Sequence, residues 1–481
     1  MVFRRWFSLW AMAWPALAWA QSAGPAPTPA AVEWQVRDTT RVEAWRFFEP
    51  PPGGGTPDYT FVATRLFARL DVRRPRYELT GAIQYVQFGH LPEHATGPGP
   101  LGAGPQYFDQ SGSTASHHVY VRLLQLKLKA PGHGVTVQFG RFGYTSGAES
   151  ASGDSKIETV KRQRIDSRMI GEFEFSLYQR TFDGARLDLD TARWHGTAAW
   201  MVPTQGGFEE SAGASLRDVH LAAGTFSIKP GPSMRHTDVQ GFVYRYDDTR
   251  PVKARPDNMF TAASVADVHI TSFGGSVVGA YPARGGQVDA LVWIVGQTGR
   301  WYGQPHGAGA AAVEAGFQWT SVPWRPWLRA GWFRSSGDPD ARDGRHDTFF
   351  QMIPTVRRYS LSTVYNSMNS SEVFGQVLLR PRANVNVRVD VHRLRLTDAA
   401  DLWYAGSGAT QRAGAVFGFS GRRSNGSTDF GTMVEGTVDW AVSPHLSIGG
   451  YAGRMRGGDV VAGTFAGRHL LFTYLETTVS F

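Results

Sequence analysis

The sequence contains no cysteine among its 481 residues. An exported chain without cysteine cannot be held together by disulfides, so a disulfide-stapled scaffold is excluded. Beyond the N-terminus, no stretch approaches the roughly 18 consecutive apolar residues that a transmembrane helix needs. If the chain is exported, its stability must come from another source of closed hydrogen bonding, and a closed β-barrel would supply it.

Motifs for catalysis and for metal or phosphate binding are also missing. The 14 histidines are scattered, with no HExxH or His-x-His pattern on a regular element. The glycine-rich pieces GAGPQ and HGAGAAA lack the strand, helix and lysine context of a phosphate-binding loop, and we interpret them as loop glycines. No Ser, His and acidic residue can be aligned as a triad. We therefore expect no enzyme activity, no metal site and no cofactor.

The N-terminus has the three parts of a secretory signal. They are Arg4 and Arg5, an apolar run over residues 6–17, and the small-residue motif Ala-Trp-Ala at 18–20. The alternative, a membrane anchor, needs about 20 apolar residues, whereas this run is shorter and is interrupted by Pro15. We expect residues 1–20 to be removed and residues 21–481 to form a single domain.

The remaining composition is that of a β-rich protein with many turns. It includes 56 Gly, 27 Pro and 13% aromatic residues, and the mean hydropathy is −0.27. Removing the signal takes away two of the 49 Lys and Arg residues, which leaves 47 against 41 acidic residues, a net charge of +6. An excess of this size fits a basic pore or a basic surface against anionic lipopolysaccharide.

Several segments alternate strictly between apolar and polar residues, as a barrel wall between lipid and a wet lumen requires. In the segment 384–392, four valines alternate with Asn, Arg, Asp and His. The same pattern occurs in the segments 62–70, 124–129 and 434–440. The C-terminal segment 471–481 also alternates and ends in Phe481, which resembles the assembly signal of outer-membrane barrels. The alternative, a water-soluble sandwich, would pack these apolar faces against each other.

The breaks between segments predict the strand number. Short Pro- or Gly-marked breaks occur at 74–75, 131–134, 191–193, 229–232, 282–286, 322–326, 380–383 and 442–444. Longer polar stretches occur at 49–58, 89–116, 143–180, 204–216, 247–262, 297–310, 335–371, 397–430 and 456–467. Outer-membrane barrels have short periplasmic turns and long external loops, so eight turns and nine loops predict an all-β transmembrane antiparallel barrel of about 18 strands.

Two passages resemble the alginate-export family of outer-membrane barrels. The first includes Gly140 and Arg141, then Arg168, Ile170 and Gly171, then Phe182, Asp183, Gly184 and Arg186. The second includes Gly431, Glu435, Asp439, Ser443, Pro444, His445, Leu446, Gly450 and Tyr451. Family loops commonly open with Gly-Arg-Gln, whereas this chain has Gly140-Arg141-Phe142, and the polar pore residues also differ. The family's substrate therefore does not transfer to this chain.

The phases of the alternating segments, together with the resemblance, predict which charged residues face the lumen. The expected lining residues are Arg65, Arg69, Lys127, Lys129, Arg141, Arg168, Arg186, Arg388 and His392, with Asp183, Asp188, Asp390, Glu435 and Asp439 as counter-charges. Several weak guanidinium and ammonium sites would attract an anion and release it again. Alternatively, these residues brace the strands as salt-bridge ladders, and Arg168 and Asp183 pin the long third loop inside the channel.

The leading functional hypothesis is a passive outer-membrane channel for an anionic oligosaccharide, polysaccharide or small organic anion. The alternatives are a general or nutrient-specific uptake porin, a barrel enzyme, and a closed structural or adhesive barrel. We expect a monomer that contacts outer-membrane lipid and lipopolysaccharide and has no nucleic-acid partner. Export would also imply periplasmic proteins that deliver the polymer.

Overall fold

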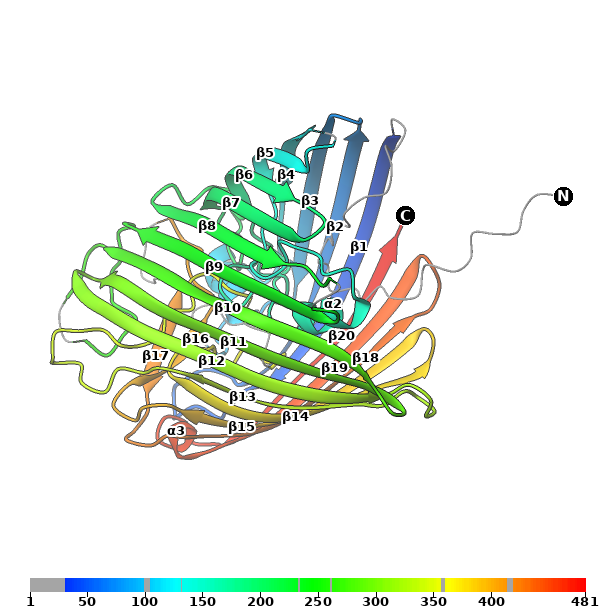
Figure 1. Ribbon diagram of the computed structural model, residues 1–481. Coiled ribbons are helices and arrows are strands. Elements are labelled where there is room, and N and C mark those ends of the chain that lie inside the picture. Colours follow the sequence, from blue (N-terminus) through cyan, green and yellow to red (C-terminus); the bar gives the residue numbers. More distant parts are fainter. Residues whose placement is uncertain are drawn as a thin grey trace.

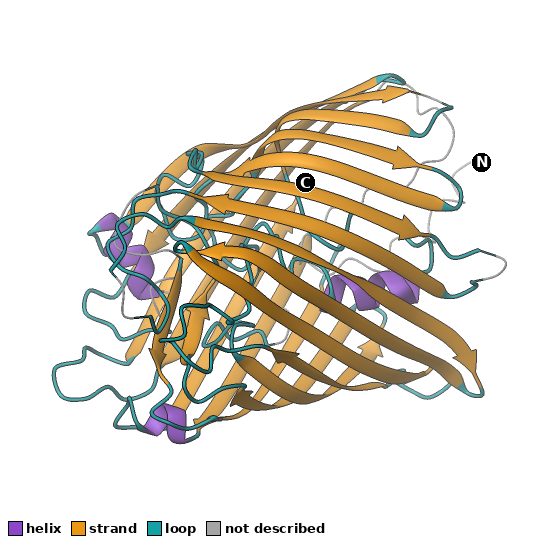
Figure 2. Ribbon diagram, turned by 60° about the vertical axis from the view of Figure 1, so that its left-hand side comes forward, coloured by secondary structure: helices purple, strands orange, loops and turns teal. Residues whose placement is uncertain are grey.

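The computed structural model describes residues 31–98, 104–130, 132–231, 234–259, 262–355, 360–412 and 418–481. The predicted signal peptide, residues 1–20, lies outside these ranges. Eighteen strands form one antiparallel sheet that closes into a barrel, as the turn pattern predicts (Figure 1). A separate two-stranded hairpin and short helices lie in the connections between the barrel strands (Figure 2).

The barrel strands differ in length from eight to 16 residues. They are β1 (Ala31–Arg46), β2 (Asp58–Arg73), β3 (Tyr77–Gly89), β4 (Ser116–Ala130), β5 (Val135–Phe142), β6 (Phe182–Asp190), β7 (Trp194–Pro203), β8 (Val219–Ile228), β9 (Thr237–Asp248), β10 (Val268–Ala283), β11 (Gly286–Trp301), β12 (Gln304–Trp319), β13 (Trp327–Ser335), β14 (Ser370–Arg382), β15 (Val385–Leu396), β18 (Asp429–Ala441), β19 (Leu446–Gly457) and β20 (His469–Ser480). The hairpin is formed by β16 (Leu402–Gly406) and β17 (Phe419–Arg423), and the helices are α1 (Gly104–Ser111), α2 (Ser155–Arg164) and α3 (Asp459–Ala462).

The first and last strands close the barrel. Strand β1 pairs antiparallel with β20 from Arg37 opposite Ser480 to Arg46 opposite Leu471. The backbone of Phe481 continues this ladder, exchanging two hydrogen bonds with Val36 of 2.9 and 3.0 Å. Closure removes the unpaired sheet edges that would otherwise need water or another chain, which is how a cysteine-free chain satisfies its backbone.

The outer wall of the barrel is apolar and the inner wall is polar. Along β15, Val389 and Val391 are exposed outward while Arg388, Asp390 and His392 are buried inward. The outward apolar rows predicted from the sequence are confirmed in β2, β4, β18 and β20 as well, where Leu66, Leu70, Leu124, Leu126, Leu128, Val434, Val438, Trp440, Leu471 and Leu475 are exposed. This arrangement places hydrocarbon outside and a polar lumen inside.

Arginine introduced at the middle of this outer wall should destabilise the barrel. Ile294 lies midway along β11, faces outward and is 56% exposed. We expect Ile294→Arg to lower the free energy of unfolding by about 2–4 kcal/mol, because the charge must enter the bilayer midplane. Val288→Arg, on the same face but near the strand's end, should cost only about 0–1 kcal/mol. Denaturant unfolding in lipid vesicles, followed by tryptophan fluorescence, measures both; equal losses would contradict a lipid-facing wall.

The eight predicted short turns all join consecutive barrel strands, and eight of the nine predicted loops are present. The prediction of a loop at 297–310 was wrong. There β11 and β12 continue to a tight turn at Tyr302 and Gly303, both with positive φ. The run of Gly and Ala in this segment supplies small side chains, and Ala310 and Ala312 lie against the buried core inside the barrel. The small residues therefore make space within the lumen and do not mark a loop.

The described residues contain no helix with the length and apolarity that a membrane span requires.

Candidate functional site

The third loop, residues 143–181 between β5 and β6, folds into the barrel and carries α2. Asp154 caps the N-terminus of α2, because its carboxylate accepts hydrogen bonds from the backbone N–H groups of Lys156 (2.8 Å) and Ile157 (3.2 Å). The side chains of Ile157 and Val160 are buried in the larger of the hydrophobic clusters inside the barrel. The helix is thus packed against the wall, close to β10 and β11.

Glu314 of β12 is the anchor point for the third loop on this wall. Its carboxylate lies 2.8 Å from Arg164 Nε and 3.1 Å from Arg168 Nη2, both in the third loop. Arg329 of the neighbouring strand β13 also contacts it, with 3.2 Å between Nη1 and Oε2. These side chains are at most 2% exposed. Three guanidinium groups therefore share one buried carboxylate, and its removal would take away the ion pairs that join Arg164 and Arg168 to β12, while Arg329 would keep its ion pair with Asp289.

Two further ion pairs extend this anchorage along α2. Lys156 Nζ lies 3.7 Å from Asp289 of β11 and 3.1 Å from the ring centroid of Trp327. Lys161 Nζ lies 3.4 Å from Asp238 of β9. The basic face of α2 is consequently matched to carboxylates on β9, β11 and β12.

The end of the third loop is held by the opposite part of the wall, on β1, β3 and β4. Arg41 donates to the carbonyl of Phe175 (2.8 Å), and Gln84 donates to the carbonyl of Leu177 (3.0 Å). Arg122 of β4 contacts both Glu172 and the carbonyl of Arg180. Because one end is fixed to β9–β13 and the other to β1–β4, the third loop crosses the lumen from wall to wall.

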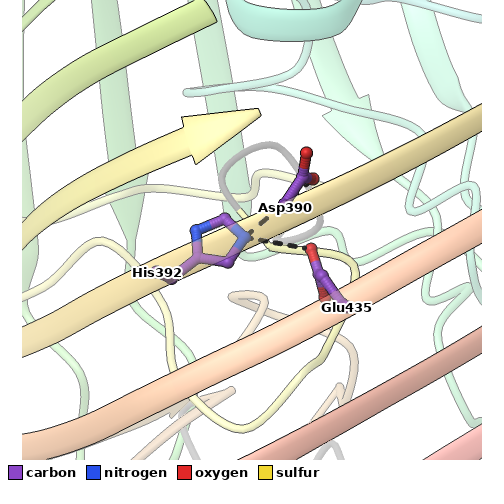
Figure 3. Close-up of side chains that lie close together, drawn as sticks. All are labelled: Asp390, His392 and Glu435. Carbon is purple, nitrogen blue, oxygen red and sulfur yellow. Dashed lines mark ion pairs between the residues drawn. The ribbon is translucent and has the colours of Figure 1, made fainter. Parts of the chain in front are cut away.

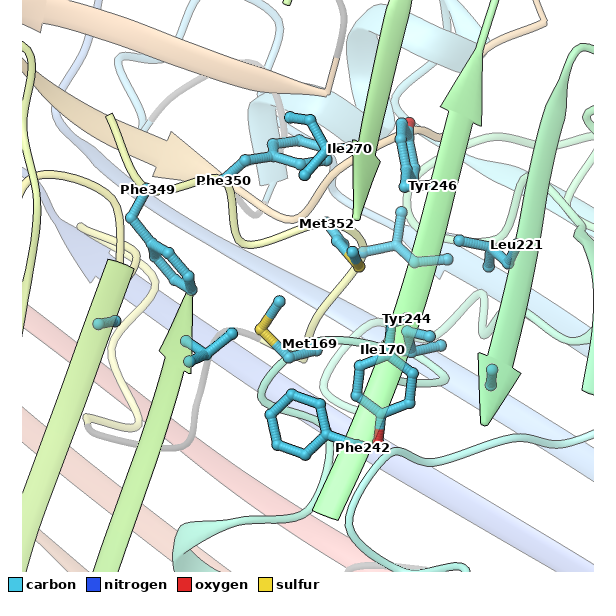
Figure 4. Packing of buried hydrophobic residues seen from close by; sticks show 14 of the residues in the cluster. Met169, Ile170, Leu221, Phe242, Tyr244, Tyr246, Ile270, Phe349, Phe350 and Met352 are labelled. Atoms are coloured by element: carbon cyan, nitrogen blue, oxygen red, sulfur yellow. The ribbon is translucent and has the colours of Figure 1, made fainter. Parts of the chain in front are cut away.

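A second inward-folded segment lies between β13 and β14, and its described residues 336–355 and 360–369 include those that pack on the third loop. Backbone hydrogen bonds join Gly171 N to Ile353 O (2.9 Å) and Ile353 N to Met169 O (3.1 Å). Met169 and Ile170 lie beside Phe349, Phe350 and Met352 and face the inward side chains of β8–β10 (Figure 4). This apolar contact fills part of the barrel interior and narrows the lumen.

The structure places most of the sequence-predicted lining residues on the inner wall. The basic side chains that face inward from the strands are Arg65, Arg69, Lys127, Lys129, Arg186, Arg388 and His392. The acidic side chains on the same face are Asp188, Asp390, Glu435 and Asp439. Arg168 reaches the lumen from the third loop. Many of them are paired: Arg69 with Asp71, Lys129 with Glu78, Arg186 with Asp188, and Arg388 with Asp390. Salt-bridge ladders thus account for part of this set.

Three lumen cations on β1, β2 and β4 differ from the others. They are Arg65, Lys127 and Arg37, and the last of these was not predicted from the sequence. None of the three forms an ion pair with any residue that the structure describes. Arg65 Nη1 is buried and has no hydrogen-bond partner in the described part of the chain. Arg37 lies opposite Phe67, and Phe67 lies opposite Gln84, so Arg37 shares a row of the sheet with a residue that holds the third loop. Lys127 lies further towards the periplasmic end.

The prediction that Arg141 and Asp183 line the lumen was wrong. They pair with each other across β5 and β6, 2.7 Å apart, on the face opposite to the fully buried Phe142 and Phe182. Residues one apart along a strand point to opposite faces, so this pair lies on the outer surface near the extracellular ends of the strands. The motif that resembles the family does not indicate which face of the strand its residues occupy, and the short stretch from 140 to 142 has no clear alternation of polar and apolar residues.

A buried cluster on β14, β15 and β18 surrounds His392. Its Nδ1 lies 2.6 Å from Glu372 Oε1, and its Nε2 lies 3.3 Å from Glu435 Oε1 and 3.9 Å from Asp390 Oδ2 (Figure 3). The antiparallel pairing of β15 with β18 brings these side chains together, because it places Asp390 opposite Glu435, 45 positions along the chain. No local motif contains them, which is why the sequence predicted no such cluster.

A polar pocket of about 610 Å³ opens among the extracellular connections. It is lined by Gln110, Gln205, Glu209, Asp218, Pro251, Gln411 and Arg412. Burial raises the pKa of Glu209 to about 7, so this carboxyl changes its charge close to neutral pH. The pocket therefore offers amide groups, one guanidinium and two carboxyl groups to a polar solute.

Comparison with solved structures gives the same architecture. OccAB1 of Acinetobacter baumannii is 10% identical, with a TM-score of 0.56, and the match covers 93% of this chain and 96% of that one. A BenF-like porin of Pseudomonas fluorescens Pf-5 is 8% identical, with a TM-score of 0.57. OpdK of Pseudomonas aeruginosa, solved with vanillate, is 8% identical, with a TM-score of 0.55. Each match covers 93% of this chain and 98% of the other. At these identities the likeness shows the fold alone.

Sequence comparison identifies the family. Among curated proteins no sequence matches significantly. The model of the family described as alginate export matches residues 146–469, about two thirds of the chain. The match includes the third loop, Glu314, and the strands that carry Asp390, His392 and Glu435. With a closed barrel of 18 antiparallel strands around it, this protein belongs to the alginate-export family of bacterial outer-membrane β-barrels.

Proposed function

We propose that this barrel is a passive channel for anionic solutes, either anionic oligo- or polysaccharides or small organic anions. The observation that carries the proposal is the set of three lumen cations without ion pairs, Arg37, Arg65 and Lys127. Several lumen carboxylates pair with Arg or Lys, whereas Asp439 and, in the third loop, Glu149 form no ion pair with any described residue. On the part of the inner wall formed by β1, β2 and β4, the charge without an ion-pair partner is therefore positive.

The spacing of these cations suits transport better than tight binding. They lie on three different strands, and Lys127 is displaced from Arg65 towards the periplasmic end. Separate weak sites let a solute pass from one to the next, whereas a single tight site would retain it. No step in this scheme needs a catalyst, so the channel is proposed to be no enzyme.

Small organic anions are the second candidate solute class, and the third loop is the reason. It is fixed to opposite parts of the wall through Glu314 and Arg41, so the free part of the lumen is narrower than the barrel. A narrowed lumen admits a monomeric carboxylate more readily than a polymer. The vanillate bound to OpdK is a carboxylate of this kind, although that likeness extends only to the fold.

Current block in planar bilayers tests the proposal and separates the two solute classes. Oligouronates added to one side should interrupt the ionic current through the purified protein in a concentration-dependent way, and neutral dextran oligomers of equal length should not. Block by monomeric carboxylates alone would assign the channel to small organic anions. Block by the dextran at the same concentrations, or by neither class of anion, would contradict an anion-binding lumen.

The remaining partners follow from the same proposal. Outer-membrane lipid and lipopolysaccharide would contact the apolar outer wall and its basic extracellular rim, where Arg454 and Arg456 are exposed. Export of a polymer would need periplasmic proteins that deliver it to the short-turn end. The closed sheet leaves no strand edge for a neighbouring subunit, which favours a monomer.

A further inference from the structure

The cluster around His392 has the arrangement of a metal site. Asp390, His392 and Glu435 each offer one ligand atom, and these atoms all lie within 4.8 Å of one another. Two atoms bound to one ion at about 2.1 Å each are roughly 3.4 Å apart at a tetrahedral angle. The observed 3.3 Å from His392 Nε2 to Glu435 Oε1 is close to this separation, and the 3.9 Å to Asp390 Oδ2 is slightly wider.

Glu372 of β14 orients the imidazole ring for such a role. Its Oε1 lies 2.6 Å from His392 Nδ1, on the side of the ring away from Asp390 and Glu435. A proton on Nδ1, donated to Glu372, leaves the lone pair of Nε2 pointing at the two carboxylates (Figure 3). Metal-binding histidines are held by a carboxylate in this way, which fixes their tautomer and raises their basicity.

Two polar atoms of this cluster lack hydrogen bonds although their residues are almost completely buried. His392 is 0% and Asp390 1% exposed. Neither His392 Nε2 nor Asp390 Oδ1 has a hydrogen-bond partner among the residues that the structure describes. Buried polar atoms are nearly always satisfied, and a bound ion would give a partner to His392 Nε2 and to the Asp390 carboxylate.

The charge of the cluster also calls for a cation. Asp390, Glu435 and Glu372 carry three negative charges, and Arg388, which contacts Asp390, supplies one positive charge. With a neutral imidazole the buried cluster has a net charge of −2. Unpaired buried charge is strongly unfavourable, and one divalent ion would neutralise it.

We propose that His392 Nε2, Asp390 and Glu435 bind a divalent transition-metal ion such as Zn²⁺, with Glu372 holding the ring and Arg388 holding Asp390. Nitrogen and carboxylate oxygen are ligands that Zn²⁺ accepts, and water would complete the coordination. The ion also stabilises the segment 336–369, because Glu435 accepts hydrogen bonds from Ser360 Oγ (3.0 Å) and Leu361 N (2.9 Å). This role is structural and is independent of the transported solute.

Metal content of the full mature protein tests the site. Tag-free protein refolded in detergent is stripped with EDTA, incubated with Zn²⁺ or Co²⁺, and passed through a desalting column. We expect about one Zn²⁺ per chain by mass spectrometry and visible absorption bands with Co²⁺. His392→Gln should lose both signals, and Glu372→Gln should weaken binding by roughly 10- to 100-fold.

His195→Gln is the matched control. His195 also lies on the lumen wall beside carboxylates, but both ring nitrogens have hydrogen-bond partners, Asp190 (2.8 Å) and Thr197 (3.0 Å). This variant should retain the ion. Heat-modifiable migration in gels verifies that each barrel is folded, and Asp390→Asn replaces His392→Gln if the latter does not fold. Wild-type protein that retains no more metal than His392→Gln would overturn the proposal, and the cluster would then be an imidazolium ion-pair network.

Discussion

Glu314→Gln is expected to release the third loop and to increase the single-channel conductance several-fold. The substitution keeps the shape of the side chain but removes the one charge that Arg164, Arg168 and Arg329 share. Removing one partner of a buried ion pair costs about 3–5 kcal/mol. Each 1.4 kcal/mol is a factor of ten, so the equilibrium between held and released loop should shift by roughly two to three orders of magnitude. Single-channel recording in planar bilayers measures the result.

The barrel itself should survive this change, because its closed backbone ladder does not depend on Glu314. Glu78→Gln is the matched control: Glu78 also faces the lumen, yet its one ion pair within the described part of the chain is with Lys129, whose side chain is 37% exposed. An exposed pair contributes about 0–1 kcal/mol, so the conductance should stay near that of the wild type. Equal conductance in Glu314→Gln and the wild type would show that the third loop does not limit the current.

The double substitution Arg65→Glu with Lys127→Glu should reverse the charge selectivity of the channel. It puts carboxylates in place of two of the three cations on β1, β2 and β4 that form no ion pair with any described residue, and it leaves Arg37 in place. In a narrow lumen the fixed charge determines which ion enters, since local charge acts in a low-dielectric surrounding. We expect the zero-current potential in a KCl gradient to change sign. The limits for a tenfold gradient are about +59 and −59 mV.

Arg456→Glu provides the control for this experiment. Arg456 lies near the extracellular end of β19, points outward and is exposed. It reverses one charge outside the lumen, half of the change that the double variant makes inside, so the zero-current potential should move little, and less at high ionic strength, where exposed charges are screened. If Arg456→Glu and the double variant shifted the potential equally, the effect would come from surface charge, and the proposed lumen sites would be wrong.

The fold was predictable because its determinants are local. An alternating row such as 384–392 fixes which side chains face lipid, and short Pro- or Gly-marked breaks fix where the chain reverses. Eight such breaks with both termini at the same end require 18 strands, which is the number observed. The prediction of a loop at 297–310 was wrong because Gly and Ala are common in loops and are also used in strands whose small side chains leave room for a neighbouring segment.

The lumen was less predictable because its contacts join distant residues. Arg164 and Glu314 are 150 positions apart, and their partnership depends on how the third loop enters the barrel. Phase gave the orientation of Arg65 and Lys127 correctly, but no sequence pattern indicates that their neighbours leave them without ion pairs. For Arg141 and Asp183 the orientation itself was predicted wrongly. They were assigned to the lumen from the family resemblance, and the strand β5 is too short for an alternating pattern to show which face they occupy.

The zero-current potential of the wild-type protein tests the central claim most directly. Purified protein is inserted into a planar bilayer of neutral lipid with a tenfold KCl gradient across it. We expect discrete conductance steps and a zero-current potential displaced towards the chloride equilibrium potential. Absence of steps, or displacement towards the potassium equilibrium potential, would contradict a passive channel whose lumen attracts anions.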